Sequence, residues 1–330
     1  MMRLNRAGRV FLAAAVGLAV ALTAAACSSS SAATVPRPAG LEKTHLTVGA
    51  LPVVDTAGLY LAIKNGYFKQ EGLTVKVVPV TKSPDAIPEM EQGKVDIIGG
   101  ANYVSFFQSQ LASGGKLKFK VLVDGIACSS DTFDVLTLPS SGITIPAQLA
   151  GKTIAVNVLN NIQTLLANTA LKAANVNPAT VHYKLVPFPQ MAAALKAHQV
   201  DAISAVEPFI TAAELNVGAD TILSTCTGPT ANFPISGYFA TQAWAQKYPH
   251  TARAFQAAMA RGQALADSDR AAVEQVLPTY IKLTSEQAAI VNLGQFPTTL
   301  DATHVQRVAS LMFTGGLINH QFSVQPLLFR

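Results

Sequence analysis

Charged residues are scarce in this sequence. Lys, Arg, Asp and Glu make up 13% of the 330 residues, whereas half of the residues are hydrophobic. Disordered chains and chains that wrap nucleic acid need many charges and few apolar residues, so the composition argues against both classes. The net charge of +5 falls to +2 if the N-terminal segment that contains Arg3, Arg6 and Arg9 is removed. No Arg lies between Arg37 and Arg253, so few bidentate cations are present to hold a strongly anionic ligand.

Cysteine is also rare, with one residue each at positions 27, 128 and 226. The chain has no CxxC or HExxH pattern and its six His are scattered, so we predict no metal centre. Outside the cytoplasm two spare thiols commonly pair, but pairing requires Cα atoms within about 7 Å. Whether Cys128 and Cys226 form a disulfide or are two small buried apolar residues therefore stays open.

The first residues are typical of a secretory leader. A basic segment precedes an apolar run from Val10 to about Leu22, and its roughly 13 residues fall short of the roughly 20 that a membrane-spanning helix needs. The run ends in "LTAAAC", which resembles the lipobox of bacterial lipoproteins, although Ala24 stands where that motif usually has Leu. The resemblance implies that Cys27 becomes the lipid-bearing N-terminus. We expect a signal peptide at 1–26 and a flexible tether at 27–44.

Beyond the tether, apolar strands alternate with amphipathic helices. The first unit, "LTVGALPVV" (46–54), passes through Asp55-Thr56 into a helix that reaches about Asn65, and similar units recur to about residue 215. This alternation predicts βαβ units and largely parallel sheets. From residue 243 onward the pattern instead predicts helices, at 243–266, 270–280, 285–292 and 302–314.

Five segments in order along the chain resemble the solute-binding proteins of ABC importers of the nitrate, sulfonate and taurine type, a family that includes binders of thiamine-pyrimidine precursors. These segments are the strand-turn-helix opening, "AIKNGYFKQEGL" (62–73), "GKVDIIGGA" (93–101), "LAGKTIAV" (149–156) and "HQVDAISAVEPF" (198–209). The resemblance implies an α/β type II periplasmic-binding-protein fold: two α/β lobes with a ligand cleft, and a helical C-terminal part. Lobe one is then expected at 45–133 and 238–330 and lobe two at 134–237, with crossovers near 133–138 and 235–238.

In open parallel sheets, ligands bind beyond the C-terminal ends of the strands, where helix N-termini expose unpaired N–H groups. Small polar residues stand at such ends, and the resemblance adds a cleft role for Glu207. The predicted ligand-binding residues are Asp55, Thr56, Ala57, Asn102, Tyr103, Asn160, Asn161, Glu207, Phe209 and Phe233.

Each of these residues also has a purely structural interpretation, which the sequence leaves open. Thr56, Asn102 and Asn161 suit the N-caps of their own helices. Asp55 and Glu207 suit the first turn of a helix, where an acid interacts favourably with the helix dipole. The aromatic residues suit the core as well as the cleft. Two departures from the family pattern are "NVLNN" in lobe two and Val206, which stands where the family often has Trp.

The resemblance implies a substrate-binding subunit that is extracytoplasmic and anchored by lipid, and that delivers a small organic molecule to an ABC permease and its ATPase. We expect a monomer without cofactor or catalytic activity. The alternatives are a ligand sensor for a membrane signalling partner and a pyrimidine-precursor synthase; the synthase branch uses an active-site His and a Cys-rich loop, whereas the only His before the expected crossover, His45, precedes the first strand. Ligand identity stays open, with Asp55 and Glu207 slightly favouring a neutral or cationic molecule over a sulfonate held by helix N-termini.

Overall fold

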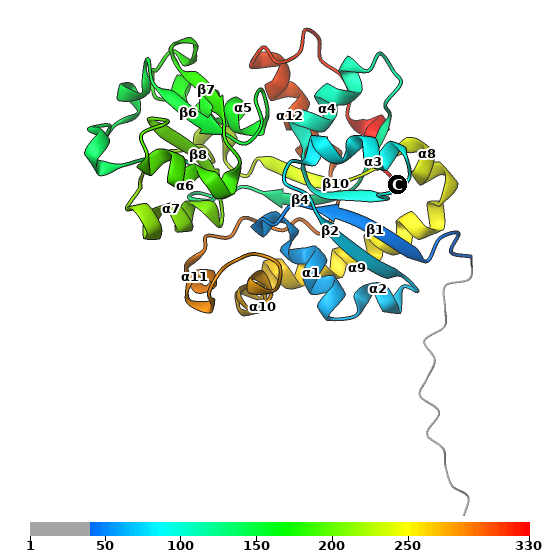
Figure 1. Cartoon of the computed structure of the whole chain (residues 1–330). Coiled ribbons are helices and arrows are strands. Elements are labelled where there is room, and N and C mark those ends of the chain that lie inside the picture. Colours follow the sequence, from blue (N-terminus) through cyan, green and yellow to red (C-terminus); the bar gives the residue numbers. More distant parts are fainter. Residues whose placement is uncertain (1–39) are drawn as a thin grey trace, which may run out of the picture. The chain divides into compact units, whose positions relative to one another are not determined.

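The computed structural model describes residues 40–330. The expected signal peptide, Cys27 and most of the expected tether lie outside the described residues. Within the described part, two mixed five-stranded sheets have the strand orders β2-β1-β3-β10-β4 and β7-β6-β8-β5-β9 (Figure 1). We call the part built on the first sheet lobe one and the part built on the second sheet lobe two. The predicted α/β class is confirmed.

The strands of lobe one are β1 (His45–Ala50), β2 (Thr74–Pro79), β3 (Ile97–Asn102), β4 (Phe119–Ala127) and β10 (Pro234–Thr241). Those of lobe two are β5 (Phe133–Thr137), β6 (Thr153–Val156), β7 (His182–Leu185), β8 (Ala202–Val206) and β9 (Asp220–Ser224). In each lobe three neighbouring strands are parallel: β2, β1 and β3 in one, and β7, β6 and β8 in the other. The later strand β10 and the strand β5 run antiparallel to their neighbours. The βαβ units predicted from the sequence account for the parallel part of each sheet.

Helices cover the sheets. Those of lobe one's first part are α1 (Ala57–Lys64), α2 (Tyr67–Gln70), α3 (Ile87–Glu91) and α4 (Tyr103–Ala112), and those of lobe two are α5 (Ile162–Ala173), α6 (Phe188–Lys196) and α7 (Phe209–Val217). The C-terminal helices are α8 (Gln242–Lys247), α9 (Pro249–Ser268), α10 (Arg270–Val276), α11 (Ser285–Ile290) and α12 (Ala302–Thr314). The helix expected at 243–266 is two helices, because Pro249 begins a new one.

Packing of α9 against α1 fixes the start of lobe one. The two helices approach closely at Gly58 and Gly262, where an added Cβ on either residue would collide with the other helix. Apolar side chains of both helices, including Leu59 and Phe255, join a buried core with Leu46 and Val48 of β1. Because β1 and α1 share this core with α9, both ends of the turn that joins β1 to α1 are fixed in place.

The chain passes between the lobes twice, through residues 128–132 and 225–233. Both passages come before the segments expected as crossovers; the first of those segments, 133–138, contains β5, and the second, 235–238, lies within β10. The chain re-enters the sheet of lobe one at Pro234, whereas we expected lobe two to extend to residue 237. A disulfide joins Cys128 at the start of one passage to Cys226 in the other, with Cα atoms 5.7 Å apart. Across the described residues, the structure contains no helix with the length and apolar character needed to span a bilayer.

Candidate functional site

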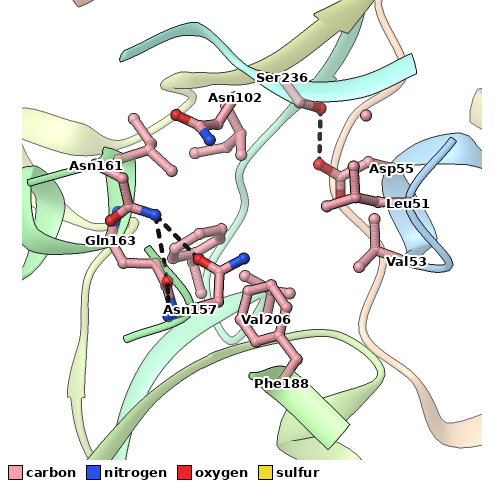
Figure 2. Close-up of a pocket in the computed structure, with 14 residues that line it drawn as sticks. Leu51, Val53, Asp55, Asn102, Asn157, Asn161, Gln163, Phe188, Val206 and Ser236 are labelled. Carbon is pink, nitrogen blue, oxygen red and sulfur yellow. Dashed lines mark hydrogen bonds between the residues drawn. The ribbon is translucent and has the colours of Figure 1, made fainter. Parts of the chain in front are cut away.

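A small cavity of about 30 Å³ lies between the lobes, with walls contributed by both (Figure 2). Lobe one contributes Leu51, Val53, Asp55, Gly100, Asn102, Ile235 and Ser236. Lobe two contributes Phe133, Asn157, Asn161, Ile162, Gln163, Phe188 and Val206. A cavity of roughly 150 Å³ accommodates benzene and about 10–15 Å³ accommodates one water. The lobes are therefore closed around a space for only a few atoms, and they must part before a larger molecule enters.

Asp55 reaches the cavity from the turn between β1 and α1. Thr56 Oγ1 donates hydrogen bonds to the carbonyl oxygens of Leu51 and Val53, each at 3.0 Å, and this folds residues 51–56 into a tight turn. Ser236 Oγ, on strand β10, donates to Asp55 Oδ2 at 2.7 Å. The carboxylate is thereby held at the cavity wall (Figure 2).

The environment of Asp55 disfavours its charge. Removal from water raises the pKa of the carboxyl to about 6, although the hydrogen bond from Ser236 acts in the opposite direction. The group is still ionised at neutral pH. None of the described residues that line the cavity is Lys, Arg or His, so no cation of the wall compensates this charge.

Asn102 enters the cavity wall from the end of β3. Its Oδ1 accepts a hydrogen bond from Ser105 N at 2.8 Å and caps α4. The preceding Gly100 has φ +65°, a left-handed conformation that favours glycine. A Cβ at Gly100 would lie 2.9 Å from Thr56 Cγ2, so glycine also allows β3 to approach the Asp55 turn.

Three buried amides form the wall in lobe two. Asn161 caps α5, because its Oδ1 accepts from Gln163 N at 3.0 Å and from Thr164 N at 3.4 Å. Its Nδ2 donates to Asn157 Oδ1 at 3.0 Å. Gln163 Oε1 accepts from Asn157 N at 2.8 Å. With its oxygen bound to Asn161, Asn157 presents its Nδ2 donor toward the cavity (Figure 2).

Of the ten predicted ligand-binding residues, the cavity brings together three, Asp55, Asn102 and Asn161. Thr56 and Ala57, which follow Asp55 in the chain, are fully buried and do not line the cavity. Tyr103 is also fully buried, and its hydroxyl donates to Asp124 Oδ1 at 2.9 Å. Asn160 is exposed outside the cavity, in the turn before α5.

The lobe-two acid Glu207 lies outside the cavity wall and bonds to lobe one's C-terminal part. Its Oε1 accepts from Asn292 N at 3.0 Å and from Thr211 Oγ1 at 2.9 Å. Its carbonyl oxygen accepts from Val54 N at 3.4 Å. Glu207 therefore joins the two lobes, a position that the pattern "EPF" does not reveal.

The two predicted phenylalanines also lie outside the cavity. Phe209 stacks on Phe188, with ring centroids 5.2 Å apart, and it borders a separate apolar groove of about 350 Å³ between Pro52 and Leu283. Phe233 is buried in the second passage between the lobes.

Sequence reasoning missed Asn157, Gln163, Phe133, Phe188 and Ser236. Asn157 directly follows β6, so the rule that ligands bind at strand ends could have identified it. Phe133 and Ser236 belong to segments expected as crossovers, and crossovers border the cleft in a two-lobed fold. Gln163 and Phe188 carry no such signal.

Among residues 40–330, no group of three or more His, Cys, Asp or Glu side chains is arranged to hold a metal ion.

Known proteins resemble this chain in both sequence and fold. The bicarbonate transport ATP-binding protein CmpC of Synechocystis is 28% identical over 235 residues, which are 64% of this chain and 33% of that protein. The chain thus spans about a third of the length of this relative. Residues 54–271 match the sequence model of the family described as NMT1/THI5 like.

Two solved structures show the fold. The periplasmic aliphatic sulphonate binding protein SsuA from Escherichia coli superposes with a TM-score of 0.67 at 18% identity, over 87% of this chain and 98% of that one. The periplasmic nitrate-binding protein NrtA from Synechocystis superposes with a TM-score of 0.71 at 14% identity, over 84% of this chain and 83% of that one. The predicted periplasmic-binding-protein fold is confirmed.

Proposed function

The chain belongs to the NMT1/THI5-like family, and from this premise we propose that it is the extracytoplasmic substrate-binding subunit of an ABC importer. It captures a small organic molecule between its lobes. In this proposal residues 1–26 are a signal peptide, Cys27 carries the lipid anchor, and 27–44 form the tether. The lobe boundaries lie where the chain passes between the sheets, at 128–132 and 225–233.

The observation that carries the proposal is the cavity with walls from both lobes. A ligand that touches both walls binds the closed form better than the open form, and this difference in affinity shifts the equilibrium toward closure. Asp55, Asn102, Asn157 and Ser236 are the side chains that we assign to ligand contact, and Asn161 orients Asn157. Thr56, Ala57, Tyr103 and Phe233 support the walls from behind.

The names of the relatives support a role in import. CmpC is named as an ATP-binding protein of bicarbonate transport, and SsuA and NrtA are named as periplasmic binding proteins. The partners in the proposal are an ABC permease and its ATPase, to which the closed monomer delivers its ligand. The chain performs no catalysis and needs no cofactor for this task.

The test is a screen of the purified protein against small organic solutes of all charge types. A cognate solute should raise the melting temperature, because it binds the folded state alone, and should reduce the radius of gyration in solution scattering. Neighbouring asparagines provide a matched control: Asn157→Ala removes a cavity donor and should weaken binding by about tenfold or more, whereas Asn160→Gly, which suits the positive φ of this exposed position, should leave affinity unchanged. A screen in which no solute both stabilises and compacts the protein would contradict the proposal.

A further inference from the structure

Asp55 brings a negative charge into the cavity, and no Lys, Arg or His among the described residues of the wall balances it. Its described hydrogen-bond partner is the neutral hydroxyl of Ser236. Tyr238 and Tyr280 lie close enough to interact electrostatically with Asp55, but burial raises the pKa of each phenol well above its ordinary value, so both are uncharged. A charge withdrawn from water is costly unless it is paired.

Two other buried acids, Asp124 and Glu207, have more hydrogen-bond partners than Asp55. Asp124 faces His304 Nδ1 at 3.1 Å and also accepts from Tyr103. Glu207 accepts from Thr211 and from Asn292. Asp124 and Glu207 thus each accept from two groups of the fold, whereas Asp55 accepts from Ser236 and faces a cavity wall without cations.

The wall opposite Asp55 offers donors and apolar surface. Asn157 directs its Nδ2 toward the cavity, because its Oδ1 is occupied by Asn161. Phe133 provides apolar surface on the same lobe, as does Phe188 (Figure 2). A ligand that fits both walls needs a donor at one end and an acceptor at the other.

We propose that the ligand carries a cationic N–H group, of the ammonium or amidinium type, which pairs with Asp55. A hydrogen-bond acceptor at its other end faces Asn157, and its apolar part contacts Phe133 and Phe188. This inference rests on the proposed solute-binding function. An anion at the same place would face the Asp55 carboxylate in a poorly hydrated space, where like charges repel strongly.

Three probes of almost identical planar shape test the charge preference: acetamidinium, acetamide and acetate. Their dissociation constants are measured at pH 7.5 by NMR titration of the purified protein. We expect acetamidinium to bind at least about tenfold more tightly than acetate, as expected for a charge-assisted hydrogen bond in place of a repulsion.

Variants show whether Asp55 is the cause of the preference. Asp55→Asn should reduce the acetamidinium-to-acetate ratio to near one, while Asp220→Asn, an equal charge change at an exposed site on β9, should retain the ratio. Asn157→Asp places a second carboxylate in the cavity and can still accept from Asn161, so the ratio should rise. Melting curves show that each variant is folded.

Tighter binding of acetate than of acetamidinium, equal binding of the two, or no measurable binding of any probe would each overturn the inference. So would an unchanged ratio in folded Asp55→Asn. Failure of the inference is distinguishable from failure of the proposed function: an anion that compacts the protein in the solute screen would leave solute capture intact and refute only the cationic ligand.

Discussion

Asp55 illustrates at the scale of one residue how a proposed ligand-binding side chain can lower the stability of the fold. The folded protein holds this carboxyl in a poorly hydrated place and gives it one neutral hydrogen-bond partner. A pKa of about 6 means that the folded state binds the Asp55 proton more tightly than the unfolded state, in which an Asp has a pKa near 3.9. The folded state is therefore favoured when Asp55 is protonated, and this advantage is lost as the pH rises from about 4 through 6.

The Asp55→Asn variant should consequently be more stable than the natural protein at pH 7, by about 2 kcal/mol after allowance for partial solvent exposure. The amide oxygen can still accept from Ser236. The difference should shrink toward pH 4, because the natural residue is then mostly protonated. Urea unfolding from pH 4 to 7 measures the difference, with Asp220→Asn as the control. A variant that is less stable at pH 7 would show that the Asp55 charge stabilises the fold.

At the scale of elements, the two passages between the lobes behave as one unit. Cys128 and Cys226 are bonded, and Cys128 N donates to Phe233 O at 2.9 Å. Thr225 N donates to Phe133 O at 3.0 Å. The passages thus run side by side and are tied at the place about which the lobes must move. In the proposed capture of a solute, we expect this pair of passages to act as the hinge between the lobes.

Removal of the disulfide should destabilise the protein without changing its ligand preference. The bond spans 98 residues of sequence, and a loop of that length corresponds to about 2–5 kcal/mol of stabilisation, because the unfolded chain loses conformational freedom. The double variant Cys128→Ser, Cys226→Ser is compared with the natural protein by denaturant unfolding under non-reducing conditions. Equal denaturation midpoints would mean that the bond contributes nothing to the free energy of unfolding.

At the scale of the whole molecule, closure in the proposed function would depend on contacts across the cleft as well as on the ligand. Glu207 accepts hydrogen bonds from Val54 and Asn292 of lobe one, so part of the closed form is held without any solute. The cavity of about 30 Å³ then opens only when these contacts break. A lipid at Cys27 would keep this opening and closing near the membrane, where the proposed permease lies.

Cys27→Ala should release the protein from the membrane or leave it unprocessed, because the thiol is the attachment point for the acyl chains in the proposed anchor. Fractionation of cells and the intact mass of the protein are the measurements. The natural protein should be heavier by its lipid and should sediment with membranes. Equal mass and equal membrane retention in the two proteins would contradict lipid anchoring.

The class of fold could be predicted from local patterns in the chain. Apolar runs of strand length alternate with amphipathic helices. This local pattern is typical of a sheet of parallel strands that is covered by helices. The same pattern located the strand ends, and the small polar residues at those ends include Asp55, Asn102 and Asn161 of the cavity wall. The helical C-terminal part followed from the change of period after residue 243, although the break at Pro249 was missed and the helices expected at 270–280 and 285–292 end earlier, at Val276 and Ile290.

Tertiary structure decided which side chains meet. Glu207 stands at a strand end like Asp55, yet the packing of lobe two against Asn292 directs its carboxylate across the cleft and outside the cavity. Ser236, the partner of Asp55, is 181 residues away in sequence, and Cys128 finds Cys226 only because two distant passages run together. Local patterns specify the conformation of a segment and not its partners, because partners are chosen by the packing of both lobes at once.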